Sequence, residues 1–111
     1  MRTITCDHFE FGTPDSEQSL QLALAKPSRY CPNLTALLRS CGASSMVAEP
    51  PPQHWGRWSL ILSHLKEFAG IDPPHPSKWR EVMLIVDDWN DLELGFAFES
   101  TIGWYYWSTS A

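Results

Sequence analysis

The stretch Leu92–Glu99 constrains the fold of this chain more than any other part of the sequence. Along it, large apolar side chains alternate with glycine, alanine and glutamate. Because successive side chains of a β-strand point to opposite faces of a sheet, this alternation predicts a strand with one apolar face and one small, acidic face. Gly95 and Ala97 leave little bulk on the acidic face. We therefore expect another group to pack flat there, either an aromatic side chain of the next strand or a partner.

Strands are also predicted on both sides of this stretch. Val82–Val86 is apolar at every position, which is typical of a strand covered on both faces, although a buried helix can have the same composition. The polar segment Asp87–Asp91 then predicts a hairpin with Asn90 and Asp91 near its tip. After the alternating stretch, Thr101–Gly103 fits a three-residue hairpin loop with the glycine in the left-handed conformation.

The facing of the last predicted strand, Trp104–Trp107, depends on the length of the loop before it. With a two- or four-residue loop, Tyr105 and Trp107 join the apolar face, and with a three-residue loop the other two aromatic residues do so. The sequence does not decide between these arrangements. In either case two large rings share the acidic face with Glu93 and Glu99.

Helix-capping signals predict that helices precede this strand block. Thr13 followed by Pro14 is typical of a helix start, and a glycine follows each of two later apolar runs, as at many helix ends. Gly56 disfavours a helix interior by about 1 kcal/mol, so a helix start near Arg57 stays open beside one at His54. The predicted elements are a strand at Arg2–Cys6 or His8–Phe11, helices at Thr13–Ala25, Asn33–Cys41 and His54–Ala69, and an extended strap over residues 43–53.

These elements predict one α+β domain over residues 1–111, with a three- to four-stranded antiparallel sheet (a C-terminal β-meander) packed against N-terminal helices. A chain of this length buries about two-thirds of its unfolded surface, enough for a core without disulfides.

The net charge of −5 argues against direct binding to nucleic acid or an anionic membrane, and it is compatible with a basic protein partner. No apolar run approaches the about 20 residues of a membrane helix. The three cysteines form no disulfide framework, which favours a reducing cytoplasm.

Metal-binding and catalytic motifs are weak in this sequence. Cys6 and His8 have no second close pair to complete a zinc site, and no phosphate-binding glycine motif is present. Cys31 lies before a proline near a helix start, where a thiol can be activated, but no family signature surrounds it. We therefore predict no metal, no cofactor and no enzymatic activity. The alternative is a small hydrolase or metal-dependent enzyme that uses Cys31 or His64 with a nearby carboxylate.

The acidic and aromatic face of the strand block is the main functional candidate. Trp and Tyr are frequent at interface hot spots, and we expect about half of the late rings to fill the core and the rest to face outward. Acidic side chains around such rings attract a basic partner. Pairs such as Asp88 with Glu93 can also bind a cation or act as acid and base, but a solvated acidic turn is the commoner arrangement. The predicted partner-binding residues are Asp87, Asp88, Trp89, Asp91, Glu93, Glu99, Trp104 and Tyr106.

In length, charge and its acidic hairpin, the chain resembles small acidic inhibitor proteins, such as bacteriophage anti-CRISPR proteins and bacterial toxin-immunity proteins. The resemblance implies a cytoplasmic protein, in a bacterial or phage-infected host cell, that binds a larger and often basic protein and blocks its active or nucleic-acid-binding surface. It transfers no functional residue to this chain. The sequence leaves open whether the protein is a monomer or a homodimer with Val82–Val86 at its seam.

Overall fold

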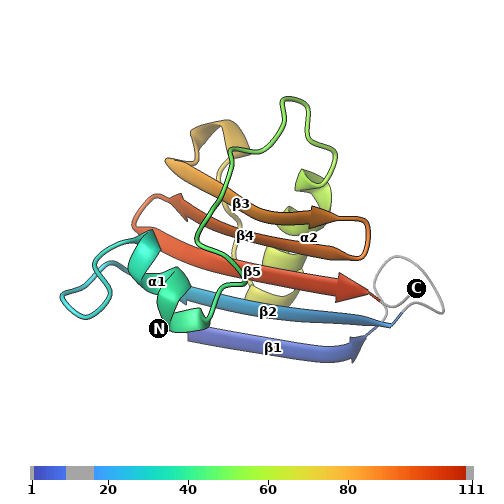
Figure 1. Cartoon of the computed structure of the whole chain (residues 1–111), viewed down its shortest axis with the longest axis horizontal. Coiled ribbons are helices and arrows are strands. Elements are labelled where there is room, and N and C mark those ends of the chain that lie inside the picture. The colour runs from blue at the N-terminus through green and yellow to red at the C-terminus, as the bar shows by residue number, and fades with distance from the viewer. Residues whose placement is uncertain (1, 10–16, 110–111) are drawn as a thin grey trace.

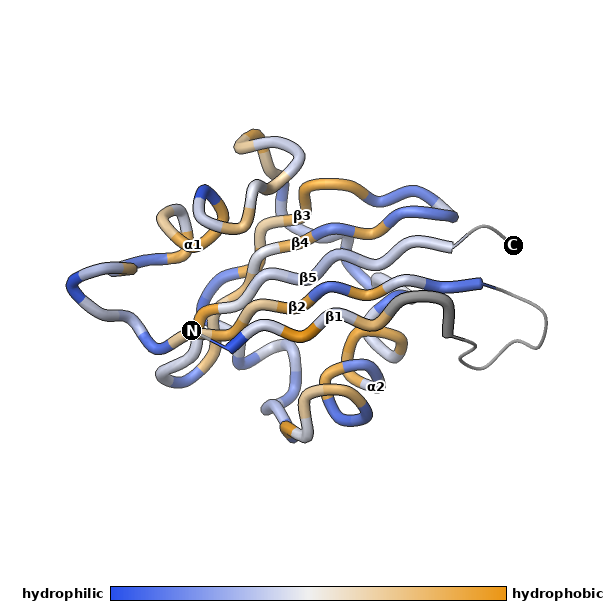
Figure 2. Tube along the Cα trace, turned by 90° about the horizontal axis from the view of Figure 1, so that it is seen from below, coloured by the Kyte–Doolittle hydropathy of each residue, from blue (hydrophilic) through white to orange (hydrophobic). Residues whose placement is uncertain are grey.

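A sheet of five antiparallel strands forms the centre of the computed structural model, which describes the backbone of residues 2–9 and 17–109 and the side chains of residues 2–6 and 17–109. The strand order is β1-β2-β5-β4-β3, so β1 and β3 are the edges (Figure 1). Two helices lie on opposite faces of this sheet (Figure 2). The elements are β1 (Arg2–Phe9), β2 (Gln18–Ala25), α1 (Leu34–Cys41), α2 (Trp58–Ala69), a 3-10 turn (Pro76–Lys78), β3 (Glu81–Asp88), β4 (Asp91–Phe98) and β5 (Thr101–Thr109).

The side of the sheet that α2 covers, called here the α2 face, carries most of the large apolar side chains. Trp79 packs there against Phe96 and Phe98, with ring centroids 5.2 and 4.9 Å apart. The side that α1 covers, called the α1 face, carries smaller residues. The buried apolar residues of the α2 face include Leu20, Leu22, Leu24, Ile61, Leu65, Leu92, Leu94, Phe96, Phe98, Tyr105 and Trp107, and those of the α1 face include Ala23, Leu34, Leu37, Leu38, Ala97, Ile102 and Trp104.

Residues 18–25 form the strand β2, although the sequence predicted a helix over Thr13–Ala25. Leu20, Leu22 and Leu24 occupy alternate positions and all lie on the α2 face, but the same spacing also fits one side of a helix. Pairing with both β1 and β5 decides for the strand, because it satisfies the backbone groups on both sides. The predicted α+β class is confirmed. The predicted three to four strands and the N-terminal helix are wrong, and residues 13–16 lie outside the described residues.

The β4–β5 hairpin has a two-residue loop, since Phe98 pairs directly with Thr101. The predicted three-residue loop at Thr101–Gly103 is therefore wrong. Gly103 lies inside β5, where an added Cβ atom would come within 2.2 Å of the Phe96 ring. This glycine makes room for a packed ring and not for a turn.

The length of this loop decides the facing of β5. Tyr105 and Trp107 lie on the α2 face, as expected for a two-residue loop. Trp104 and Tyr106 lie on the α1 face together with Glu93. The expectation that two large rings share a face with this glutamate is thus confirmed.

The helices agree closely with their sequence signals. The side chain of Asn33 caps α1 by accepting a backbone hydrogen bond of 2.9 Å, and left-handed Gly42 and Gly70 end α1 and α2. The helix α2 begins at Trp58 directly after Arg57, which is the later of the two predicted starts. In the described part of the chain, neither helix has the length and hydrophobicity needed to cross a bilayer.

The helix α1 fills the small, flat part of the α1 face. A Cβ atom added to Gly95 would lie 3.0 Å from the end of the Leu38 side chain and 3.2 Å from that of Leu34. The group that packs on Gly95 and Ala97 is therefore a pair of helical leucines, and not the aromatic side chain or partner that we expected. The position of α1 leaves the acidic part of the same face, nearer the β3–β4 hairpin, for other contacts.

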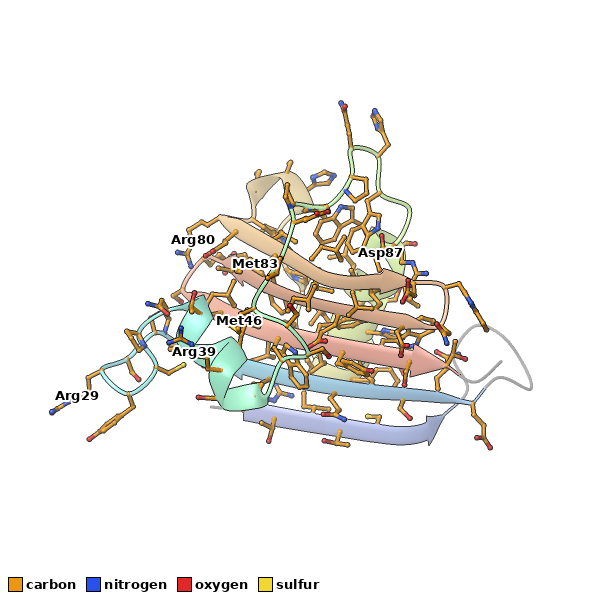
Figure 3. All side chains as sticks on the ribbon, viewed as in Figure 1. Arg29, Arg39, Met46, Arg80, Met83 and Asp87 are labelled. Atoms are coloured by element: carbon orange, nitrogen blue, oxygen red, sulfur yellow. The ribbon has the colours of Figure 1, made fainter. Side chains whose placement is uncertain are left out.

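The strap, residues 43–53, runs across the α1 face from the end of α1 to the edge strand β3 (Figure 1). Glu49 and Leu84 exchange two backbone hydrogen bonds, of 3.0 and 2.8 Å. Met46 of the strap lies over the sheet on the same side as Met83 of β3 (Figure 3). The extended strap predicted from the consecutive prolines is confirmed, and it occupies the free edge of β3 near its middle.

Candidate partner-binding face

Five of the eight predicted binding residues lie on the α1 face. Asp88 pairs with Asp91 and Glu93 pairs with Tyr106, and Trp104 lies two residues before Tyr106 on β5. Paired residues of antiparallel strands share a face, so these side chains form one patch that extends to the β3–β4 hairpin. We call these five residues the acid–aromatic face.

Trp89 stands at the tip of this hairpin, beside the acid–aromatic face. Its side chain is 69% exposed. The loop that carries it has only two residues, because Asp88 and Asp91 still pair. The backbone carbonyl of Asn90, the other loop residue, accepts a hydrogen bond of 2.9 Å from the Thr109 N–H at the end of β5. The exposed ring therefore projects from a short, anchored turn.

Asp87 does not belong to this face. It pairs with Leu92, which places it on the α2 face, at the end of β3 nearest the start of α2 (Figure 3). There it accepts a hydrogen bond of 3.1 Å from the Trp55 indole N–H and forms an ion pair of 3.4 Å with Arg57. Arg57 also donates to the backbone carbonyl of Asp88 at 2.7 Å. These contacts fix the hairpin to the N-terminal end of α2, which is a structural role.

Glu93 is completely buried, although it is a carboxylate. Its Oε2 atom accepts hydrogen bonds from the Trp104 indole N–H at 2.8 Å and from the Ser44 backbone N–H at 3.1 Å. Both donors are neutral, and no Lys, Arg or His among the described residues lies within ion-pairing distance of it. Burying a carboxylate is costly unless hydrogen bonds or opposite charges compensate. Here the two hydrogen bonds hold the charge in place without neutralising it.

Glu93 is one of the residues that line a pocket of about 200 Å³. Trp104 and Tyr106 form part of its wall, with ring centroids 6.2 Å apart and planes inclined by 37°. The described residues that line it are Gln21, Cys41, Gly42, Ser44, Glu93, Trp104 and Tyr106, and none of them carries a positive charge.

Tyr106 links this pocket to the outer acids of the face. Its hydroxyl donates to Asp91 Oδ1 over 3.4 Å. Burial, followed by the nearby negative charges of Asp91 and Glu93, raises the pKa of Tyr106. The phenol therefore stays protonated over the physiological range and keeps its hydrogen to donate.

Glu99 lies at the opposite end of β4 from the hairpin, and so apart from the other acids (Figure 1). It occupies the β4–β5 loop with a φ of 51°, a conformation that is strained for a residue other than glycine. Its neighbours there line a different pocket, of about 420 Å³, and include Arg2, Lys26 and Phe98. The structure does not bring Glu99 together with the acid–aromatic face.

The late aromatic rings are more buried than the sequence led us to expect. Trp104 and Trp107 are each 8% exposed, and Tyr105 is completely buried. Tyr106 is half-buried, and only Trp89 among these rings is largely exposed. We expected about half of these rings to face outward, but only Trp89 is exposed and only Tyr106 is partly exposed.

The residues of the enzymatic alternative lie on different faces of the sheet. His64 is buried on the α2 face, where its Nδ1 atom lies 2.6 Å from the Tyr105 hydroxyl and burial lowers its pKa to about 4. Cys31 is packed at the α1 face beside Cys41, and burial and then the Cys31 thiol raise the pKa of Cys41. Within residues 2–9 and 17–109, no cluster of three or more potential ligands is placed to hold a metal ion.

Two contacts of this region were not predicted from the sequence. The Ser44 N–H, the partner of Glu93, is a backbone group from the strap, and no side-chain pattern marks it. Arg57, the partner of Asp87, lies thirty residues earlier in the chain. In the sequence, only its position between two tryptophans at a predicted helix start could have indicated that it contacts the sheet.

Comparison with known proteins adds no assignment, because no protein-family model, curated protein or solved structure matches this chain.

Proposed function

We propose that this protein is a non-enzymatic binder that docks its acid–aromatic face and Trp89 on a larger, basic protein and thereby inhibits it. The observation that carries this proposal is Trp89, which is 69% exposed on a short, anchored turn next to Asp88 and Asp91. Burial of apolar surface contributes about 25 cal/mol per Å², and a ring on a rigid turn loses little conformational entropy on binding. Exposed tryptophans of this kind are common hot-spot residues.

The charge around Trp89 supports a basic partner. Asp88 is exposed and Asp91 is half-buried, and in the described part of the chain neither side chain forms an ion pair. Arg57 pairs with Asp87 on the other side of the hairpin. The acids beside the ring are thus available to attract a positive surface and to raise the association rate.

Inhibition follows from the shape of the hairpin. A projecting tip fits a concave surface, and the ligand sites of proteins are mostly concave. Occupying such a site, whether it binds a substrate or a nucleic acid, is sufficient to block it. We propose that the protein acts as a monomer, since the strap already pairs with β3 at Leu84 and a second copy would have to displace it.

The proposal is tested by comparative affinity capture from host-cell extract, followed by binding kinetics with the purified partner. Asp88→Lys alters the proposed face, and Glu67→Lys makes the same change in net charge at an exposed position on α2. The partner should be retained by the wild type and by Glu67→Lys. With Asp88→Lys, the association rate at low salt should fall by about tenfold, and Trp89→Ala should speed dissociation by about thirtyfold.

Two results would overturn this assignment. Equal association rates for Asp88→Lys and Glu67→Lys would show that the net charge alone attracts the partner. A dissociation rate unchanged by Trp89→Ala would place the docking surface elsewhere.

A further inference from the structure

We infer that the pocket lined by Glu93 receives a lysine side chain of the partner. This inference rests on the proposed function, because it names the group that the acid–aromatic face recognises. Three features meet in the pocket: a buried carboxylate, two aromatic rings and the absence of any positive lining residue in the described chain. Each favours a cation, and together they suit a primary ammonium group.

The carboxylate in the lining of the pocket supplies the attraction. Glu93 is completely buried and its two hydrogen-bond donors, Trp104 and Ser44, are neutral. In surroundings of low dielectric constant, an uncompensated charge acts over several ångströms more strongly than it does in water. Asp91, hydrogen-bonded to the Tyr106 hydroxyl, adds a second negative charge at the rim.

The aromatic walls favour the same kind of ligand. A cation near the face of Trp or Tyr is attracted by the ring quadrupole, with about 0.5–1 kcal/mol at exposed sites. Trp104 is held by its bond to Glu93 and Tyr106 by its bond to Asp91, so both rings are positioned in advance. The cost of ordering the site on binding is correspondingly small.

Lysine fits this pocket better than arginine. An arginine prefers two parallel hydrogen bonds to both oxygens of a carboxylate. The Glu93 Oε2 atom already accepts two hydrogen bonds, and its Oε1 atom lies 3.4 Å from the Ser44 N–H. A compact ammonium on a slender stem needs only the charge and the ring faces, and it suits a pocket of about 200 Å³.

The test uses the isolated protein and a small probe, so it needs no partner. The probe is Nα-acetyl-lysine methylamide, and its neutral match is the same compound acetylated on the side-chain nitrogen. The readout is the NMR signal of the Trp104 indole N–H, which reports directly on the bond to Glu93. The charged probe should shift this signal in a saturable way, with binding at least about tenfold tighter than that of the neutral probe.

Variants separate the contributions of charge and rings. Glu93→Gln keeps the size of the side chain and should weaken binding of the charged probe by at least about tenfold. Tyr106→Leu leaves Glu93 intact and should weaken it by about threefold. Asp87→Asn, on the other face of the hairpin, is the matched control and should leave it unchanged.

Equal shifts with both probes would overturn the inference, as would tight binding retained in either Glu93→Gln or Tyr106→Leu. If Glu93→Gln fails to fold, Tyr106→Leu decides the question alone. Failure of this titration while partner binding stays sensitive to Asp88 would reject the lysine pocket and leave the docking proposal intact. If the lysine probe binds as expected but the partner binds the Asp88→Lys and Trp89→Ala variants as well as the wild type, the docking proposal is rejected instead.

Discussion

The α2 face and the α1 face each bury an ionisable side chain, His64 and Glu93, and they do so in different ways. His64 lies among the rings of Phe68 and Tyr105, each 5.7 Å away between centroids, and burial lowers its pKa to about 4. Glu93 lines a pocket and is held by two neutral donors. The first arrangement admits only a neutral side chain and serves the core. The second places a buried carboxylate in the lining of a pocket.

The α2 face is also packed more rigidly than the α1 face. Two glycines, one on each face, allow a direct comparison. A Cβ atom on Gly103 would come within 2.2 Å of the rigid Phe96 ring, whereas one on Gly95 would meet the flexible end of Leu38 at 3.0 Å. Gly103→Ala should therefore cost about 3 kcal/mol or more of unfolding free energy, and Gly95→Ala about 1 kcal/mol or less. Urea unfolding of both variants measures the difference. Equal losses of unfolding free energy in the two variants would mean that both faces accommodate an added methyl group equally well, and the proposed difference in packing would be wrong.

The buried histidine predicts how stability depends on pH. The folded pKa of about 4 lies below the ordinary histidine value of 6.5, so the unfolded chain binds the proton more readily. The contribution of His64 is complete above pH 6.5 and is lost as the pH falls toward 4. Between pH 7 and pH 5 the fold should lose about 2 kcal/mol through this group.

The control for this prediction removes the buried pair as a unit. His64→Leu combined with Tyr105→Phe leaves no unpaired hydroxyl, and unfolding free energies measured at pH 7 and pH 5 should then differ by about 2 kcal/mol less than in the wild type. An identical pH dependence in both proteins would show that the histidine is not held neutral by the fold.

The buried glutamate should respond more weakly to a conservative change. In Glu93→Gln the amide oxygen can still accept from Trp104 and Ser44, but charge-assisted hydrogen bonds become neutral ones. We expect a loss of about 1 kcal/mol in unfolding free energy, measured in urea at neutral pH. A loss above about 3 kcal/mol would mean that the carboxylate is chiefly a structural group, which would weaken its assignment to ligand binding.

Much of the fold follows from local signals that the sequence carries openly. The strand β4 follows from the alternation of Leu92–Glu99, and α1 from its Asn33 and Gly42 caps. The segment 18–25 was misassigned because alternate leucines suit a strand and a helix alike, and only pairing with β1 and β5 selects the strand. Gly103 was misread for a similar reason, since a glycine that admits a ring and one that permits a turn are identical in sequence.

The candidate site was predicted in part. Acids and rings of one face were correctly grouped around Glu93, because strand alternation and hairpin pairing are short-range rules. Glu99 was placed with them because the alternation of Leu92–Glu99 includes it, and Asp87 because it belongs to the same predicted hairpin. Asp87 instead forms an ion pair with Arg57 on the α2 face, and Glu99 lies in the loop at the end of β4 that is opposite the β3–β4 hairpin.

By itself the sequence determined which strands exist late in the chain, which residues alternate along them and that acids and aromatic rings share a face. These properties depend on neighbours a few residues apart, whose geometry the backbone sets. Only the tertiary structure decided that Glu93 lines a pocket together with Ser44 of the strap, that most of the rings are buried and that Trp89 stands exposed. Those outcomes depend on loop length and on contacts between distant segments, and a shift of one residue in pairing would have reversed every face.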